Sequence, residues 1–324
     1  MLIISESLAQ DLVSIEDAIE AVAATFIAMA QGKARNYPVV REVVGYADAV
    51  YGVKAGGDIS APFLGLKAGG YWPHNLPRGL TNHQSSTLMF DPETGRASGL
   101  VSANYLTGVR TGAASALAAR ALSRPDASVL GIIGTGGQSV HQLRATAKVR
   151  GLTRVHAWDP MPENVARFAA AVTALGLGLE YVAETSPQAV AEAAEIIITV
   201  TPSQKPILLK GWVRPGTHIN AMGADTKGKQ ELDPSLVAAA RLFVDEAAQA
   251  ISIGECQHAF AQGLIGAADL TALGVVLEGR AEGRRSEAEI TLFDGTGVAL
   301  QDLVVADLAM RRAIEQGRGV VVDY

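Results

Sequence analysis

The sequence predicts an α/β protein in which a domain built on a doubly wound parallel sheet is joined to an α+β domain. Two patterns predict this fold class. From Ser128 onward, short apolar runs alternate with helical segments, which is typical of parallel strands joined by crossover helices. Before that point, short apolar runs are separated by Gly, Pro, Asn and Asp, which indicates antiparallel strands and turns.

Length and composition limit the class of protein. The chain has 324 residues, of which 48% are hydrophobic and 19% are charged, so it can form about two domain cores. Its formal net charge of -6 and pI near 5.6 provide no general attraction for nucleic acid or for an anionic membrane. We therefore expect neither as a partner.

The start of the chain and its cysteine usage indicate a cytoplasmic protein. The opening "MLIISESLAQDL" lacks the basic start and the small-residue cleavage site of a signal peptide. No apolar run approaches the ~20 residues that a membrane helix needs. The single cysteine, Cys256, cannot form an internal disulfide, and the dispersed histidines without HExxH or CxxC patterns predict no metal site.

The first domain is expected over residues 1–113 together with 303–324. Ser14 and Asp17 predict the capped start of an amphipathic helix that ends at Gly32. Antiparallel strands are expected at "YPVVREVV", "AVYGVKA", "FLGLKAGG", "STLMF" and "ASGLV", with a hairpin connection at "DPETG".

Helical patterns close this domain. An alanine-rich helix is expected over Thr111 to Leu122, and the proline in "SRPDA" ends it. The tail "LQDLVVADLAMRRAIEQG" predicts a long helix that folds back on the first domain, and "GVVVDY" predicts a final strand.

The second domain is expected over residues 114–302. Its predicted strands are "SVLGIIG", "RVHAWD", "LEYVAE", "EIIITVTP", "THINAMGAD" and "RLFVDE". Its predicted helices are "SVHQLRATAKVRG", "MPENVARFAAAVTALG" and "SPQAVAEA". This alternation indicates the doubly wound parallel sheet of a Rossmann-type domain.

A glycine-rich turn follows the first of these strands. Gly134, Gly136 and Ser139 occupy the three positions of G-x-G-x-x-G/A, and a serine is still small enough for close packing of helix on strand. Asp159, at the end of the next strand, can accept hydrogen bonds from ribose hydroxyls and would repel a 2′-phosphate. The motif predicts a dinucleotide site for NAD, with NADP as the alternative. A structural turn with Asp159 as a helix cap is the competing interpretation.

Three cations of the first domain stand in apolar surroundings. Arg41 follows "YPVV", Lys67 lies within "FLGLKAGG" and Arg110 lies within "YLTGVRTGAAS". Each alone is consistent with a surface side chain or with a lysine that extends its ammonium to water. Because the first domain must supply the groups that bind a substrate, these three side chains are its candidates.

Several ordered motifs resemble the ornithine cyclodeaminase/mu-crystallin family nearly end to end. They are "LGLKAGG", "NHQSSTLMFDPETG", "RTGAASALAARAL", "GIIGTGGQS", "INAMGADTKGKQELD", "VDEAAQAISIGE" and "EITLFDGTGVALQDL". The resemblance implies a homodimer whose first domain binds a small imino or amino acid and mediates pairing. It also implies that the second domain binds NAD(P).

The resemblance implies roles for particular residues. Lys67, Arg41 and Arg110 match the cationic group that binds the substrate carboxylate, His83 is a further candidate pocket residue, and Lys67 and Asp225 match the catalytic groups. Asp225 could accept a proton from the substrate nitrogen or stabilise an iminium, or it could be only a turn residue. The cofactor contacts implied are Thr111, Gly134, Gly136, Gly137, Gln138, Ser139, Asp159, Thr199, Thr201, Met222, Gly223 and Gly295.

Several reactions are compatible with such a site. We favour NADH-dependent reduction of an imino acid, with Δ1-pyrroline-2-carboxylate as substrate and L-proline as product; alanine dehydrogenase chemistry is second. An ornithine cyclodeaminase is third, because the glutamate that the resemblance implies about ten residues after Arg41 is replaced in "AVYGVKA", with glycine at the nearest position. A ligand-binding protein without turnover is the alternative outside enzymes.

Overall fold

The computed structural model describes residues 1–323, which form two compact units. Unit 1 comprises residues 1–110 and the described residues from 298 onward, and unit 2 is Thr111–Gly297. The changes between units thus occur slightly earlier in the chain than the expected boundaries at 113/114 and 302/303. Within the described residues no helix combines the length and apolar character needed to cross a membrane.

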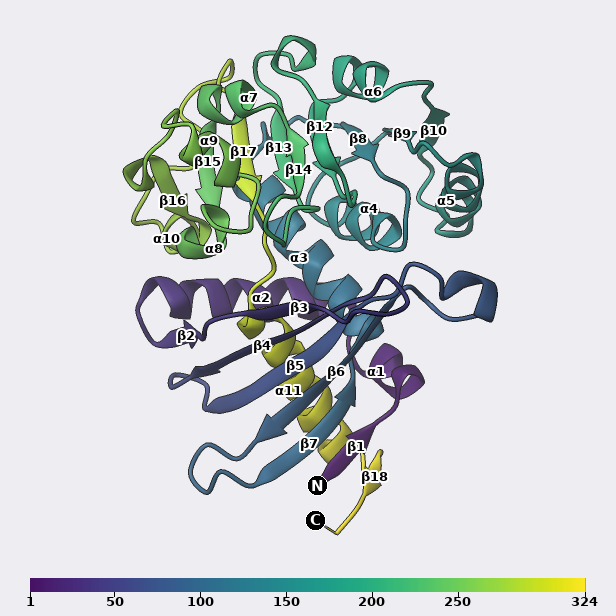
Figure 1. The fold of residues 1–324 in the computed structure, drawn as a ribbon, viewed down its shortest axis with the longest axis vertical. Helices are drawn as coiled ribbons and strands as arrows, with labels where there is room; N and C mark the ends of the chain where they lie inside the picture. Colours follow the sequence, from purple (N-terminus) through teal and green to yellow (C-terminus); the bar gives the residue numbers. More distant parts are fainter. Residues whose placement is uncertain (324) are drawn as a thin grey trace. The chain divides into compact units, whose positions relative to one another are not determined.

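Unit 1 is built on one sheet with helices against it (Figure 1). Its strands run in the order β18 (Val320–Val321), β1 (Leu2–Ile4), β7 (Ala97–Ser102), β6 (His83–Phe90), β5 (Phe63–Tyr71), β4 (Val50–Asp58), β2 (Ala34–Asn36), and β3 (Val40–Val43) also pairs with β4. All neighbours are antiparallel except β1 and β7. Its helices are α1 (Glu6–Leu12), α2 (Ile15–Ala30), the first part of α3 (Asn104–Leu122), α11 (Ala299–Glu315) and the short η1 (Leu76–Arg78).

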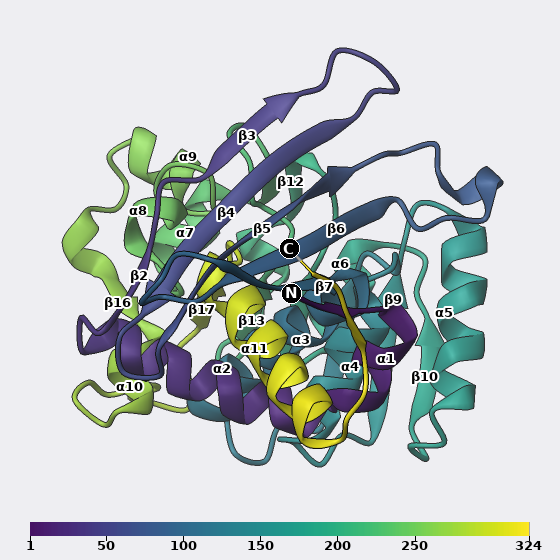
Figure 2. The same cartoon turned by 90° about the horizontal axis from the view of Figure 1, so that it is seen from below.

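Helix α11 completes the core of unit 1. Figure 2 shows it lying across the sheet, and it packs against β4, β5, β6 and α2. The helix approaches closely because Gly65 has no side chain: a Cβ there would lie 2.9 Å from a Leu303 methyl and 2.7 Å from the Leu88 carbonyl oxygen. The tail therefore folds back onto the first part of the chain.

Local signals explain α2, whereas the start of α3 depends on a distant residue. Ser14 and Asp17 form the expected capping box of α2. The prediction that α3 begins at Thr111 was wrong, because the helix begins at Asn104. The Glu6 carboxylate accepts the Tyr105 N–H in its first turn at 2.5 Å, and this contact across unit 1 leaves no local sequence signal.

Unit 2 contains a fully parallel eight-stranded sheet (Figure 1), which confirms the predicted fold class. Its strands run in the order β10 (Glu180–Ala183), β9 (Arg154–Trp158), β8 (Val129–Ile133), β11 (Ile196–Thr199), β13 (His218–Ala221), β17 (Thr291–Asp294), β15 (Arg241–Val244), β16 (Leu270–Ala272), and a separate pair is formed by β12 (Gln204–Leu208) and β14 (Gln230–Leu232). Its helices are the rest of α3, α4 (Ser139–Ala147), α5 (Pro162–Ala174), α6 (Pro187–Ala193), α7 (Pro234–Ala239), α8 (Ala247–Ala250), α9 (Gln257–Ala261), α10 (Leu273–Leu277) and the short η2 (Lys210–Trp212) and η3 (Ala267–Asp269).

The strand order positions the ligand-binding edge of unit 2. The chain proceeds outward from β8 to β10 and then returns to β11 on the other side of β8. With right-handed crossovers, α4 and α5 lie on one face of the sheet and α6 on the other. The switch point lies between the carboxyl ends of β8 and β11, where ligands bind in such sheets.

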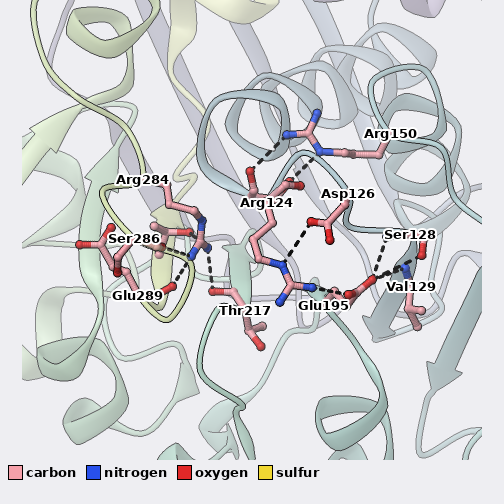
Figure 3. Close-up of polar contacts among 12 residues, drawn as sticks. Arg124, Asp126, Ser128, Val129, Arg150, Glu195, Thr217, Arg284, Ser286 and Glu289 are labelled. Atoms are coloured by element: carbon pink, nitrogen blue, oxygen red, sulfur yellow. Dashed lines mark hydrogen bonds and ion pairs between the residues drawn. The ribbon is translucent and has the colours of Figure 1, made fainter.

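The opposite edge, where strands begin, is held by polar contacts (Figure 3). Glu195, just before β11, accepts the N–H groups of Ser128 (2.8 Å) and Val129 (3.1 Å) at the start of β8. Arg124 forms ion pairs with Glu195 and, at 3.4 Å, with Asp126. These contacts hold the starts of β8 and β11 together, at the edge opposite to the carboxyl ends where a ligand is expected.

The C-terminal strand is shorter than expected. From "GVVVDY" only β18, Val320–Val321, pairs with the sheet. The expected strand also included Tyr324, which lies outside the described residues. Several short elements of unit 2, including β17 and α7 to α10, were not predicted as separate elements.

Candidate active site

Two of the predicted cations of unit 1 meet at one buried carboxylate. Lys67 Nζ and Arg110 Nε each lie 2.8 Å from Oδ1 of Asp302 on α11. Lys67 and Arg110 are 7% and 5% exposed, and Asp302 is 2% exposed. Their charges are therefore held by protein contacts rather than by water.

Side-chain amide and hydroxyl groups extend this cluster. Gln301 Oε1 accepts from Arg110 Nη1 at 3.0 Å, and Lys67 Nζ lies 3.4 Å from Thr107 Oγ1. Among the described residues, the buried Gln301 Nε2 and Asp302 Oδ2 have no hydrogen-bond partner. Gln301 Nε2 is thus a donor available to an anionic ligand.

Burial and charge change the protonation of this cluster in opposite directions. Burial, together with the charges of Arg110 and Lys54, lowers the pKa of Lys67 to about 7, although Asp302 opposes the change. Burial tends to raise the pKa of Asp302, but Arg110 and Lys67 outweigh it and lower that pKa to about 2. Near neutral pH the carboxylate is ionised and the lysine is close to its titration midpoint.

Arg41 lies on the same face of the sheet as Lys67. On β4, Lys54 is paired directly with Lys67 of β5, and Gly52, two residues before Lys54, is paired with Arg41 of β3. Residues two apart in a strand share a face, so Arg41, Lys54 and Lys67 project to the same side. This is also the side of Gly65, against which α11 packs.

His83 is placed farther from the cluster. It begins β6, where it is half-buried and paired with Tyr71, while Thr87 of the same strand is paired with Lys67. Four residues of strand separate His83 from Thr87, roughly 13 Å. His83 therefore shares the face but lies toward its end, and its role stays a prediction.

In unit 2, the glycine-rich turn has the geometry of a phosphate-binding loop. Gly134 has φ +99°, and a Cβ there would lie 2.6 Å from the Thr201 methyl, so the chain needs glycine at this turn. A Cβ on Gly136 or Gly137 would meet no atom within 4 Å, so their backbone is open to a ligand. The N-terminus of α4 follows at Ser139, and such a terminus attracts anions.

Ser139 explains the departure from the usual third glycine or alanine. Its side chain is buried and its hydroxyl donates to the Gly136 carbonyl oxygen at 2.7 Å. The serine thereby closes the turn with its own hydrogen bond. Gln138, the residue before the helix, makes no side-chain capping bond.

Asp159 lies beside this turn at the end of β9. Its Oδ2 accepts the Thr135 N–H at 2.8 Å, and its Oδ1 accepts from Met161 N and Asn164 Nδ2, both at 3.0 Å. The prediction that Asp159 caps the next helix was wrong, because the N-cap of α5 is Met161, which has no side-chain capping bond, and Asp159 instead closes a turn with the N–H two residues on. Carboxylate oxygens have further lone pairs, so binding to a ribose hydroxyl is compatible with these bonds.

A buried glutamate connects the other predicted cofactor-binding segments. Glu231 accepts hydrogen bonds from Thr199 Oγ1 (2.7 Å), Thr201 N (2.6 Å) and Gly223 N (2.9 Å). Burial raises the pKa of Glu231, while these donors oppose that change. Glu231 positions the loops after β11 and β13, a role that its isolated place in "KGKQELD" did not indicate.

The remaining predicted residues of unit 2 lie in or next to these segments. Asp225 follows β13 and its Oδ1 accepts from Lys229 Nζ at 2.7 Å and from Thr226 Oγ1 at 3.2 Å. Met222 is buried, and a Cβ on Gly295 would lie 2.5 Å from its sulfur. Thr111 is buried in α3.

Comparisons with known proteins agree with this arrangement. The model of the ornithine cyclodeaminase/mu-crystallin family matches residues 2–317. The iminosuccinate reductase of Paracoccus denitrificans is 51% identical over 98% of each chain. The chain is similar to the solved structure of the Δ1-pyrroline-2-carboxylate reductase of Thermococcus litoralis with NADH and L-proline, with 31% identity and a TM-score of 0.94 over 99% of this chain and 100% of that one. It is also similar to an archaeal alanine dehydrogenase dimer with bound NAD, with 34% identity and a TM-score of 0.93 over 100% of this chain and 99% of that one.

Proposed function

Because the chain belongs to the ornithine cyclodeaminase/mu-crystallin family, we propose that it is an NADH-dependent reductase of small imino acids whose main substrate is iminosuccinate. The product is L-aspartate. The 51% identity to an iminosuccinate reductase over nearly the whole chain supports this substrate. It replaces Δ1-pyrroline-2-carboxylate, which the sequence alone favoured, as the first candidate.

The observation that carries the proposal is the buried cationic cluster of unit 1. Lys67 and Arg110 are both buried, and they share a single carboxylate, that of Asp302. Burying positive charge in excess is costly unless an anion compensates it. A carboxylate-bearing substrate provides that compensation.

The residues of the chain have separate tasks in this reaction. Lys67 and Arg110 hold the carboxylate next to the imine carbon, which fixes the orientation of that carbon. NADH, when bound, supplies the hydride that reduces the C=N carbon. Asp225, which matches the catalytic carboxylate of the family, is assigned the stabilisation of the protonated imine nitrogen, so one proton and one hydride convert the imine to the amine.

The cofactor assignment rests on unit 2. The open backbone at Gly136 and Gly137 and the N-terminus of α4 suit a pyrophosphate, and Asp159 suits an unphosphorylated ribose. The two similar structures were solved with NADH and with NAD bound. We therefore assign NAD(H) rather than NADP(H).

Δ1-Pyrroline-2-carboxylate is the second candidate substrate. It is favoured by the similarity to the Thermococcus litoralis reductase, solved with L-proline, at a TM-score of 0.94. It carries one carboxylate, whereas iminosuccinate carries two. Ornithine is disfavoured, because glycine stands nearest to the position, about ten residues after Arg41, where the family resemblance implies a glutamate.

Parallel assays of the purified protein test these assignments. NADH oxidation is measured with oxaloacetate plus ammonia, which form iminosuccinate, with pyrroline-2-carboxylate, and with pyruvate plus ammonia. Ornithine with NAD is tested for proline formation. We expect the highest kcat/KM with oxaloacetate plus ammonia. No turnover in any arm would contradict an enzymatic function and favour a binding protein.

The outer face of the unit 1 sheet supports a homodimer. Tyr37, Ala55, Leu64, Leu66 and Phe90 line an apolar hollow on the side away from Lys67. Apolar patches of this kind usually mark an interface. The similar alanine dehydrogenase was solved as a dimer, and sedimentation of this protein is expected to give the mass of two chains.

A further inference from the structure

Gln301, in the first turn of α11, has a side-chain amide whose two ends differ in their contacts. The residue is fully buried, and its Oε1 accepts a hydrogen bond from Arg110 Nη1 at 3.0 Å. Arginine has donors only, so the amide oxygen must face Arg110 and the NH2 group must point elsewhere. The orientation of this amide is therefore fixed by the chemistry of its partner.

The NH2 end of the Gln301 amide is a buried donor that has no hydrogen-bond partner within the described residues. Buried polar groups are nearly always paired, because an unpaired one has lost its bonds to water. Two further buried atoms share this property, namely Asp302 Oδ2 and Thr87 Oγ1. Thr87 of β6 is opposite Lys67 in the sheet register, and Asp302 is the carboxylate that Lys67 and Arg110 contact. Unpaired polar atoms are thus gathered next to these two cations.

The groups near the NH2 end favour an anion over a neutral ligand. Arg110 has five N–H donors, of which Asp302 accepts the one on Nε and Gln301 accepts one on Nη1. Helix α11 begins at Ala299, so the positive end of its dipole lies in the same turn as Gln301. A carboxylate accepts several hydrogen bonds and therefore complements both the guanidinium and the amide donor.

We propose that Gln301 is a substrate-binding residue whose Nε2 donates to the carboxylate next to the imine carbon. This inference rests on the proposed function, in which Lys67 and Arg110 hold that carboxylate. Gln301 then has two tasks, because its Oε1 orients Arg110 and its Nε2 contacts the ligand. All α-imino acids share this carboxylate, so Gln301 selects the class of substrate rather than its side chain.

The variant Gln301→Glu separates the two tasks. Glutamate has almost the same shape and keeps an oxygen for Arg110, but it replaces the amide donor with an acceptor that repels a carboxylate. We expect kcat/KM to fall on the order of a hundredfold, mainly through KM, with both oxaloacetate plus ammonia and pyruvate plus ammonia. Gln316→Glu, at the exposed residue that follows the same helix, adds the same charge and should change neither value.

A purely structural role of Gln301 gives the opposite result. If Gln301 only orients Arg110, the glutamate oxygen does so equally well, and kcat/KM of Gln301→Glu should stay within about threefold of wild type. That result would overturn the assignment. A loss confined to kcat would overturn it as well, because a contact to the bound carboxylate is made before the reaction begins.

Binding measurements keep this test separate from the proposed reaction. Titration calorimetry with succinate should show weaker binding to Gln301→Glu than to wild type and Gln316→Glu, and equal affinity of all three would refute the role of Gln301. If succinate binding depends on Gln301 but wild type reduces no imino acid, that role stands and the proposed function fails. Thermal unfolding checks folding. If Gln301→Glu is unfolded, Gln301→Met, which removes the donor without adding charge, should bind succinate more weakly, and unchanged affinity would count against the proposal.

Discussion

Lys67 and Asp302 are 235 residues apart in the sequence, yet their side chains form a buried ion pair with Nζ and Oδ1 2.8 Å apart. One residue belongs to the central strand β5 and the other to the C-terminal helix α11. The helix that completes the core of unit 1 therefore also supplies the acidic group of its cationic cluster. Removing the helix would remove both.

The lowered pKa of Lys67 predicts a particular pH dependence. In the free enzyme, kcat/KM should fall as pH rises through about 7, because Lys67 then loses the proton with which it holds a carboxylate. A bound dianion favours the charged lysine, so the corresponding fall in kcat should occur at higher pH. Lys67→Arg keeps its charge at every accessible pH. A kcat/KM profile in which wild type and Lys67→Arg share the same basic limb would contradict this assignment.

The lowered pKa of Lys67 also makes the free energy of unfolding depend on pH. Burial makes the folded-state pKa of Lys67 lower than the unfolded one, so above pH 7 the unfolded chain binds more protons than the native chain. The free energy of unfolding gains a contribution that rises with pH from about 7 to about 10. In Lys67→Met this rise should be missing when urea unfolding is compared at pH 7 and pH 9.

Neutralising Asp302 tests whether its carboxylate compensates the buried positive charges of Lys67 and Arg110. Asp302→Asn keeps the shape but leaves Lys67 and Arg110 without their shared carboxylate. Breaking a buried pair in this way typically costs about 3–5 kcal/mol of unfolding free energy. The loss should be larger at pH 6 than at pH 9, because Lys67 is neutral at the higher pH.

An added dianion provides the control for this variant. Succinate should restore less stability to Asp302→Asn than to wild type if Asp302 orients Lys67, and more if Asp302 only balances charge. The direction of the difference therefore shows whether Asp302 orients Lys67 or only balances its charge. Unchanged unfolding of Asp302→Asn at both pH values would show that the ion pair contributes nothing to the fold.

The sequence predicted those parts of the site that depend on local patterns. The turn at Gly134 and the capping of α2 by Ser14 follow from short motifs, and the structure contains both. Asp302 and Lys54 could not be found in this way. Their burial arises from long-range packing and strand register, and a shift of one residue in β4 would have turned Lys54 to the other face.

Asp159 is expected to set the choice between NADH and NADPH. In Asp159→Ser the carboxylate that would bind ribose hydroxyls and repel a 2′-phosphate is lost, so the ratio of the Kd for NADH to that for NADPH should rise about tenfold or more. The variant also loses bonds to Thr135, Met161 and Asn164. Asn164→Ala, which removes one of those bonds but keeps the charge, is the control. It should weaken both cofactors equally in fluorescence titrations.

Asp225 tests the nitrogen side of the proposed reaction. Asp225→Asn keeps the shape of the residue but removes the charge that would stabilise a protonated imine. A lost charge-assisted contact of this kind costs on the order of 3 kcal/mol in the transition state, about a hundredfold in kcat. NADH affinity should stay nearly unchanged, since the contact concerns the substrate.

The ion pair between Asp225 and Lys229 makes a control necessary. Lys229 Nζ lies 2.7 Å from Asp225 Oδ1 and also donates to the Gly223 carbonyl oxygen at 3.2 Å. If Asp225 only holds this loop, Lys229→Gln should lower kcat as much as Asp225→Asn does. If Asp225 acts on the substrate, Lys229→Gln should keep most of the activity, because the carboxylate remains. Single-turnover kinetics with the best imino acid would therefore assign Asp225 to the reaction only if the two variants differ.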